Sequence, residues 1–480
     1  MGGSPLTIRV LEIEAFERPV PFRFAFRFGA ARVDRANQAF VRVRISDGSG
    51  REATGWSAEM LMPKWFDKNP DLTPEHNADQ LRGSLRLAME TIKAAGAATA
   101  FGLHAVSEPE HHSACARVGL NGLIASFGLA LVDRAIIDAL GRLEDVPALT
   151  LVRENRLGIT SATARDLADF DFASFLSRLA IPDHIHVRHT VGLGDALDRQ
   201  DRDGDGLGDG LPETLEEVIA AYGHQFFKLK LSGAIDADIA RLERIVSIIE
   251  VRVPHYRATL DGNEQFEDES HVLAFLDAFE SAPGLRLLGE RLLFLEQPIA
   301  RAKALSAPVE RIAQRVSLEI DESDADMDAF LRARHLGYRG ISSKSCKGFY
   351  RALLNRARIA RWNADTPDKP FFMSAEDLTM QSGIALQQDL VLAGLVGADH
   401  VERNGHHFVD GMPNAPKAEQ DAFLAAHGDL YASTLGRTRL KIEKGRVALA
   451  SVASAPGLGA LVAPDRAAMS ALKLEETHEP

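Results

Sequence analysis

Five ionisable residues stand at the C-terminal ends of five successive strand-like segments. They are Lys230, Asp261, Glu296, Asp321 and Lys344, in the runs FFKLKL, YRATLDGN, LLFLEQP, SLEIDES and GISSKSC. Neighbouring members are 23 to 35 residues apart, which leaves room for one strand, one helix and two short loops. Because a (β/α)₈ barrel gathers the C-terminal ends of its strands around one mouth, we expect these five side chains to converge there.

Three carboxylates at such a mouth could hold a divalent cation. Asp261, Glu296 and Asp321 form an all-oxygen set, which favours Mg²⁺, with Mn²⁺ as the alternative. Such a cation stabilises the negative charge that develops when a proton leaves the carbon next to a carboxylate. Asn263 and Gln297 follow two of these positions and are candidates for supporting hydrogen bonds.

The lysines are the candidate bases. Lys228 and Lys230 share one face of a strand, because side chains repeat their direction every second residue. A neighbouring ammonium and a nearby cation lower the pKa of a lysine, so we expect Lys230 to act as a neutral base assisted by Lys228. Lys344 would approach the substrate from the opposite side.

Each of these residues also has an ordinary structural explanation when it is taken alone. A KLK run at a strand end is usually a solvated rim, EQP and DES are common turn sequences, and Asp261 could cap a helix. Their occurrence together, in order and each at the end of its own segment, favours one shared active site over independent structural roles.

Composition bounds the class of protein. The 480 residues are enough for two domains, and the net charge of −13 argues against nucleic-acid and anionic-membrane partners. Two cysteines, Cys115 and Cys346, argue against a disulfide framework and for a cytoplasmic protein. The first residues do not resemble a signal peptide, and the longest weakly polar run, VGLNGLIASFGLALV, is too short to span a bilayer. We expect a homo-oligomer that acts on a small-molecule carboxylate.

The order of the elements predicts an α/β protein with two domains. Strand patterns to about residue 60 and amphipathic helices from about 74 to 145 indicate an α+β domain over 1–150. From residue 184 strand and helix patterns alternate and give eight strands, which predicts a (β/α)₈ barrel over 151–411. Residues 412–480 are expected to pack back on the barrel or on the first domain, with a hairpin around Lys444 and Gly445.

An Asp-rich segment, DRQDRDGDGLGDGLPET, follows the first barrel strand. Asp201, Asp203, Asp205 and Asp209 match the early positions of an EF-hand-like calcium loop. The twelfth position, which needs a bidentate glutamate, is Pro212, and Glu213 comes one residue late. We therefore favour a flexible surface loop, and a weak Ca²⁺ site within residues 201–213 is the lesser alternative.

The segments FKLKL, TLDGN, FLEQP, LEIDES and SSKSCKG, in this order, resemble the enolase superfamily. They are most similar to its mandelate racemase and muconate lactonizing enzyme branches, over roughly residues 184–405. The resemblance implies a modified, enolase-type barrel behind an N-terminal capping domain. It also implies roles for individual residues: metal ligands at Asp261, Glu296 and Asp321, a base at Lys230 helped by Lys228, an opposed acid/base at Lys344, and supporting positions at Glu322 and Glu402.

The chain departs from this pattern in two places. A Gly-Gly pair that often follows the lysine of the sixth strand is replaced by Lys347-Gly348-Phe349-Tyr350. The seventh strand offers Ser374, Glu376 and Asp377 and no histidine, so the resemblance favours the two-lysine type over the type with a His-Asp pair.

The expected activity is Mg²⁺-dependent abstraction of a proton alpha to a carboxylate through an enediolate, by an isomerase or a lyase. The outcome would be racemisation or epimerisation, cycloisomerisation, or dehydration of a small, N-acylated or peptide-like acid. Phe22, Phe24, Phe26 and Trp65 are candidates for closing the mouth. A metal-dependent barrel lyase or hydrolase of another family is one alternative, and a calcium-binding, non-catalytic scaffold is the other.

Overall fold

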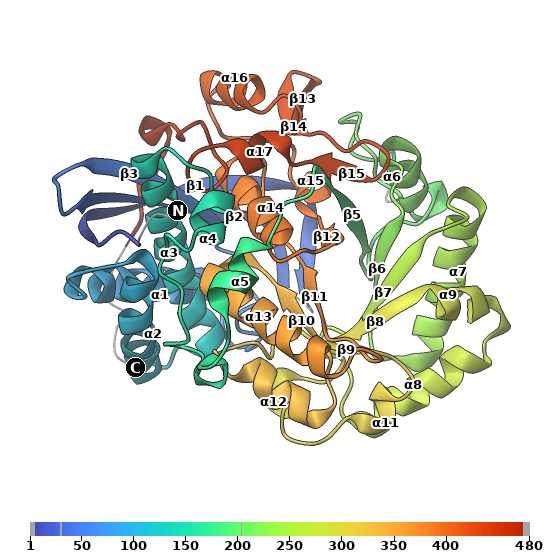
Figure 1. Cartoon of the computed structure of the whole chain (residues 1–480). Helices are drawn as coiled ribbons and strands as arrows, with labels where there is room; N and C mark the ends of the chain where they lie inside the picture. Colours follow the sequence, from blue (N-terminus) through green and yellow to red (C-terminus); the bar gives the residue numbers. More distant parts are fainter. Residues whose placement is uncertain (1–4, 29–30, 203, 474–480) are drawn as a thin grey trace.

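The computed structural model describes residues 5–28, 31–202 and 204–473. An N-terminal unit of antiparallel strands and helices, blue and teal in Figure 1, lies beside a barrel whose strands run from green to orange. The C-terminal segment, in red, runs across the top of this view from the barrel back to the N-terminal unit. Among the described residues, none of the helices combines the length and the apolar character that crossing a bilayer requires.

The N-terminal unit is a sheet covered by helices. Its main strands are β1 (Ile8–Phe28), β2 (Ala31–Asp47) and β3 (Glu52–Met60), which pair antiparallel in that order, with β4 (Ala97–Ala98) beside β1. The predicted turn between β2 and β3 is present, because the Asp47 carboxylate accepts hydrogen bonds from the backbone of Ser49 and Arg51. The helices are α1 (Pro74–Ala94), α2 (Ala100–Arg117) and α3 (Gly122–Glu144). Helix α3 packs so closely on β3 that a Cβ at Gly55 would lie 2.2 Å from Ala139 N.

In the described part of the chain, eight parallel strands close into a barrel, as the alternating pattern predicts. Strand β5 pairs with β6 on one side and with β12 on the other, which completes the ring. The strands are β5 (His184–Val191), β6 (Phe226–Lys230), β7 (Arg257–Asp261), β8 (Leu292–Glu296), β9 (Leu318–Ile320), β10 (Gly340–Ser343), β11 (Phe372–Ala375) and β12 (His400–Glu402).

Helices connect most successive barrel strands. They are α6 (Leu215–Tyr222), α7 (Ile235–Arg252), α8 (Glu269–Ser281) with α9 (Arg286–Arg291), α12 (Ala329–Leu336), α13 (Phe349–Asp365) and α14 (Ile384–Leu395). Between β8 and β9 the chain forms only the short helices α10 (Arg301–Ala304) and α11 (Glu310–Ala313). Two further short helices, α4 (Ala148–Arg153) and α5 (Phe172–Ser177), lead from the N-terminal unit into the barrel.

The C-terminal segment pairs differently from the prediction. It contains α15 (Gly405–Phe408), α16 (Lys417–Ala426), β13 (Tyr431–Thr434), β14 (Arg437–Leu440), β15 (Arg446–Ala448), α17 (Ala450–Ser454) and β16 (Ser470–Ala471). The turn expected around Lys444 and Gly445 is present, because Glu443 and Arg446 form an antiparallel bridge across it. The strands of the expected hairpin do not pair with each other: β14 pairs with β13, and β15 pairs antiparallel with β5 of the barrel. Alternating side chains indicate a strand but do not determine which strand it pairs with. Here Val447 pairs with the buried Ile185 of β5. Strand β16 adds to β1.

Two clusters of buried apolar side chains hold the described residues together. One joins the N-terminal unit to the side of the barrel that carries α13 and α14, and the other lies between the barrel and α7 and α8. Arg134 of α3 strengthens the first, because it pairs with Glu59 of β3 at 3.1 Å and donates to Gln388 of α14 at 3.3 Å. The N-terminal unit is therefore fixed beside the barrel.

Candidate active site

The five residues singled out at the strand ends meet inside the barrel. Lys230, Asp261 and Glu296 are the last residues of three neighbouring strands, and register places each of them beside the next. Asp321 and Lys344 directly follow β9 and β10. The three carboxylates and Lys344 are at most 3% exposed, so their interactions take place largely out of water.

Lys228 is the centre of the network. Its Nζ lies 3.0 Å from Asp261, 2.8 Å from Glu296, 3.0 Å from Glu376 and 2.9 Å from Glu402. Burial lowers the pKa of Lys228, but these carboxylates outweigh burial, and the pKa stands well above its ordinary value. Lys228 is consequently a permanent ammonium in this structure.

Lys230 points to one carboxylate, with its Nζ 2.6 Å from Asp261 Oδ2. Burial and the ammonium of Lys228 lower the pKa of Lys230, but Asp261, Glu402 and Glu296 together raise it, and the net pKa is raised. In the protein by itself Lys230 is therefore an ammonium, and its action as a neutral base, which assumes a nearby cation, stays a prediction. A charge that competes for Asp261 is needed before this lysine can lose its proton at neutral pH.

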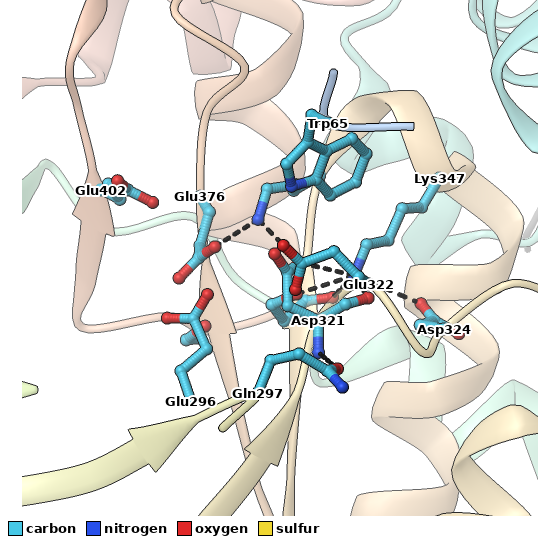
Figure 2. A network of polar contacts seen from close by, with 12 residues as sticks. Trp65, Glu296, Gln297, Asp321, Glu322, Asp324, Lys347, Glu376 and Glu402 are labelled. Atoms are coloured by element: carbon cyan, nitrogen blue, oxygen red, sulfur yellow. Dashed lines mark hydrogen bonds and ion pairs between the residues drawn. The ribbon is translucent and has the colours of Figure 1, made fainter. Parts of the chain in front are cut away.

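Lys344 lies across the barrel from Lys230 and is held by two carboxylates and a ring. Its Nζ is 2.7 Å from Asp321 Oδ1, contacts Glu376, and stands 5.1 Å from the centre of the Trp65 ring. Figure 2 shows Trp65 above the group formed by Asp321 and Glu376. Burial lowers the pKa of Lys344, but Asp321 and Glu376 raise it well above its ordinary value.

Four residues that were not predicted as site residues complete the network: Glu376, Arg188, Glu319 and Lys347. Glu376 binds Lys228, Lys344 and Arg188, the last at 2.6 Å, and is fully buried. Glu319 accepts a hydrogen bond from Ser374 at 2.7 Å. The Nζ of Lys347 lies 2.9 Å from Asp321 Oδ1, and Figure 2 shows both residues in the network. Alternation along the strands could have identified Glu319, because it lies two residues before Asp321 and so on the same face.

The donor set fits a hard divalent cation. Glu296, Glu319 and Glu322 each keep one buried carboxylate oxygen without a hydrogen-bond partner. Burial raises the pKa of all three, to about 8 for Glu319, which means that their negative charge is poorly compensated by the protein alone. Buried carboxylate oxygens with free lone pairs are the ligands that Mg²⁺ and Mn²⁺ prefer.

The predicted ligand triad is not the most compact carboxylate set. Among the described residues, Glu296, Glu319 and Glu376 have ligand atoms that all lie within 4.8 Å of one another. In the predicted triad, the ammonium of Lys228 lies between Asp261 and Glu296, and that of Lys344 holds Asp321. Asp261, Glu296 and Asp321 as the ligands therefore stay a prediction.

The supporting residues fix the backbone and side chains around this mouth. Asn263 donates from its backbone to Asp261 at 2.7 Å and from its side chain to Glu322 at 2.9 Å. The amide oxygen of Gln297 accepts from the backbone of Asp321 and Ser323 at 2.9 and 3.1 Å. Asn263 and Gln297 have positive φ values of 43° and 31°, so these contacts are made by a strained backbone.

Glu402 is the supporting residue on the last strand. It binds Lys228 and accepts hydrogen bonds from Thr190 at 2.5 Å and Asn404 at 2.8 Å. Its neighbour Arg403 turns away and pairs with Asp377 at 3.5 Å.

The segment around Trp65 covers the mouth. Lys68 lies 2.7 Å from Glu264 and 3.5 Å from Glu322, and Arg301 donates to the backbone carbonyls of Trp65 and Phe66 at 2.8 and 2.9 Å. Phe24 instead stacks on His407 with ring centres 5.0 Å apart. Phe22 packs against the core of the N-terminal unit, and the side chain of Phe26 lies outside the described residues.

In the Asp-rich loop, two carboxylates that were candidates for Ca²⁺ have arginine partners. Asp201 lies 3.0 Å from Arg244, and Asp209 lies 2.6 Å from Arg23 on β1. Asp205 is exposed, and Asp203 lies outside the described residues. A Ca²⁺ site in this loop stays a prediction.

No protein-family model matches the sequence, and no curated protein matches it. Solved structures do resemble the fold. A dipeptide epimerase from Enterococcus faecalis V583, complexed with Mg and the dipeptide L-Leu-L-Tyr, superposes with a TM-score of 0.58 at 14% identity, over 96% of this chain and 99% of the other. An N-succinyl Arg/Lys racemase from Bacillus cereus ATCC 14579 gives 0.58 at 14%, over 96% and 97%.

A putative mandelate racemase/muconate lactonizing enzyme from Roseovarius nubinhibens ISM has a TM-score of 0.58 at 17% identity, over 98% of this chain and 99% of the other. The likeness extends over nearly the whole of each chain. It confirms the fold that the motifs led us to expect, and at these identities the chemistry has to be argued from the residues in the barrel.

Proposed function

We propose that this chain is a Mg²⁺-dependent enzyme of the enolase superfamily that moves a proton on the carbon alpha to a substrate carboxylate. The observation that carries the proposal is the pair of lysines, the partly buried Lys230 and the buried Lys344, on opposite sides of the barrel. Each contacts one of the carboxylates predicted as metal ligands, Asp261 and Asp321 respectively. Mandelate racemase/muconate lactonizing enzyme-like structures share the fold, which supports the same chemistry here.

The carboxylates would hold the ion. Asp261, Glu296 and Asp321 are the proposed ligands, and Glu319 and Glu322 each have a buried carboxyl oxygen without a hydrogen-bond partner nearby. A bound Mg²⁺ supplies a Lewis acid that offsets the negative charge developing on the substrate carboxylate.

The proton itself is handled by the lysines. Lys230 would take it at Nζ after releasing its own ammonium proton to solvent, and a cation held by Asp261 would favour that release by competing for this carboxylate. Lys228 keeps its charge, because carboxylates surround it, and attracts the anionic substrate. Lys344, held by Glu376 and Asp321, delivers a proton to the opposite face. Proton removal on one face and return on the other inverts the carbon, so racemisation or epimerisation is the favoured outcome.

The proposed substrate class rests on the residues that cover the barrel mouth and on the solved structures that share the fold. Trp65 and Lys68 lie over the barrel end and offer an aromatic and a cationic contact to a carboxylic acid. The fold is shared with a dipeptide epimerase and an N-succinyl Arg/Lys racemase, which favours dipeptides and N-acylated amino acids as the first candidates.

Hydrogen–deuterium exchange tests the proposal. Dipeptides and N-acyl amino acids of both configurations are incubated with the enzyme and Mg²⁺ in D₂O, and loss of the alpha proton is followed by NMR. We expect Lys230→Met and Lys344→Met each to slow exchange from one configuration, by about 10²- to 10⁴-fold. Lys303→Met, a change of an exposed lysine outside the barrel, is the matched control and should leave exchange unaltered.

Two results would contradict the proposal. One is alpha-proton exchange that proceeds in Lys230→Met and Asp261→Asn at the rate of the unaltered enzyme. The other is the absence of exchange from every acid in the panel. Exchange from only one configuration, lost in Lys230→Met and kept in Lys344→Met, would instead identify a one-base cycloisomerase or dehydratase.

A further inference from the structure

Three histidines from three separate segments meet outside the barrel wall. His189 lies on β5, His224 in the loop between α6 and β6, and His406 in α15. On β5, Arg188 and Thr190 reach the carboxylates inside the barrel, so His189 between them faces the opposite way. The cluster is thus separated from the candidate active site by the strand itself.

The rings are close enough to share one ion. The ligand atoms of the three side chains all lie within 4.8 Å of one another. His189 and His224 are stacked with ring centres 5.2 Å apart, and His224 and His406 are 5.7 Å apart. Three nitrogens bound to one tetrahedral zinc at 2.0–2.1 Å would stand roughly 3.3 Å apart, so small side-chain rotations suffice.

The ring nitrogens lack partners. Both nitrogens of His406 and Nδ1 of His189 are buried without a hydrogen bond, and those of His224 are buried without one of good geometry, although the backbone of Val187 lies close enough to oppose slightly the lowering of the pKa of His224 by burial. A buried polar group left in this state costs about 1–3 kcal/mol. A cluster that served only as apolar packing would avoid this cost with phenylalanine, so the unpaired nitrogens point to a ligand.

The protonation state also suits metal binding, which requires neutral imidazole. Burial lowers the pKa of His189 to about 4, and burial together with the neighbouring histidines lowers those of His224 and His406 well below the ordinary value. No proton has to leave at neutral pH before an ion can bind.

We propose that His189, His224 and His406 form a second metal site, for a zinc-class divalent ion held by three imidazoles. Three histidines with no carboxylate favour Zn²⁺, Co²⁺ or Ni²⁺ over Mg²⁺. His406 also lines a cavity of about 210 Å³ together with Tyr222, Arg403 and Arg439. The fourth coordination position is therefore within reach of a water molecule or a small anion in that cavity.

Such an ion would join segments that are far apart in sequence. It would connect β5 and the loop before β6 to α15, where Arg23 of β1 donates to the carbonyl of His407 at 2.7 Å. The ion would thereby tie the first strand of the barrel to the segment that follows its last strand, beside this contact with the N-terminal unit.

Cobalt titration tests the site. The full-length protein is stripped of metal with a chelator and titrated with Co²⁺, while the visible d–d absorption is recorded and bound metal is counted. We expect one strongly absorbing, four-coordinate Co²⁺ per chain, lost in His189→Gln and His406→Gln. It should persist in His407→Gln, which alters the adjacent ring, and in Asp261→Asn, which removes a ligand of the proposed Mg²⁺ site.

A gain of signal separates the site from damage to the fold. In His406→Cys a thiolate replaces one imidazole, and the Co²⁺ form should acquire a sulfur-to-cobalt charge-transfer band in the near ultraviolet. The proposal is overturned if the unaltered protein binds no four-coordinate Co²⁺, if His406→Gln binds it as before, or if His406→Cys shows no thiolate band. Because Asp261→Asn is scored separately, failure here leaves the proposed function untouched.

Discussion

Two buried glutamates in the barrel should respond in opposite ways to the same substitution. Glu376 lies just after β11 and Glu319 lies on β9, and both are fully buried. Burial raises the pKa of Glu376, but Lys228, Lys344 and Arg188 hold it well below its ordinary value. Burial raises the pKa of Glu319 to about 8. Glutamine is neutral, like a protonated glutamate. The surroundings of Glu376 disfavour the protonated form, whereas those of Glu319 favour it.

The contacts set the size of the effect. Glu376→Gln removes the carboxylate that lies 2.6 Å from Arg188, a fully buried guanidinium that otherwise contacts His400 and the ring of Phe294. Removing one partner of a buried ion pair costs about 3–5 kcal/mol, because the remaining charge is left without compensation. Glu319→Gln leaves the charge at pH 7 nearly unchanged, and Ser374 can still donate to the amide oxygen, so we expect a change within about 1 kcal/mol.

Urea denaturation at pH 7, with chelator present and far-ultraviolet circular dichroism as the readout, compares both variants with the unaltered protein. Glu376→Gln should lower the free energy of unfolding by about 3–5 kcal/mol, and Glu319→Gln should stay close to the unaltered protein. Equal losses in the two variants, or a larger loss in Glu319→Gln, would refute the assignment of charge within the barrel.

Further predictions concern the cover of the barrel, a buried glutamate of the N-terminal unit and the Asp-rich loop. Trp65→Leu removes the ring 5.1 Å from the ammonium of Lys344, and should slow alpha-proton exchange from the configuration that depends on that lysine more than from the other. Burial raises the pKa of Glu59 to about 7, so the folded protein holds a proton that the unfolded chain releases near pH 4.5. The free energy of unfolding should therefore fall by up to roughly 3 kcal/mol as pH rises from 4.5 to 7. In Glu59→Gln the melting temperature should decrease less over this pH range than in the unaltered protein. Equal decreases in the two proteins would contradict the prediction. Arg23→Gln breaks contacts to residues 198–213 and should speed tryptic cleavage in that loop without changing the melting temperature of the barrel by more than a few degrees.

Much of the barrel could be predicted because its signals are local. The eight strand segments alternate with helical patterns, and each candidate catalytic residue lies where its strand ends. The pairing of β15 with β5 could not be predicted in this way. The alternation of RVALA is equally compatible with a hairpin to β14, and the choice depends on which edge the folded barrel leaves open.

The two proposed metal sites also differ in whether the sequence alone could reveal them. The carboxylates of the barrel mouth occur in strand-end motifs that can be recognised one by one. The histidines are separated by 35 and 182 residues and belong to no motif. Closure of β12 on β5 brings His406 to His189, so only the folded chain shows that they are neighbours.

The sequence by itself determined which residue types stand at the strand ends, because strand and helix periods are properties of the local backbone. The tertiary structure decided which charges touch. Lys230 could be expected to be a neutral base from the lysine two residues before it, yet Asp261 at 2.6 Å outweighs that neighbour and raises its pKa. The interaction of two charges depends on the distance between them and on how much water surrounds them, and both are fixed only when the barrel closes around Lys228, Lys230 and their carboxylates.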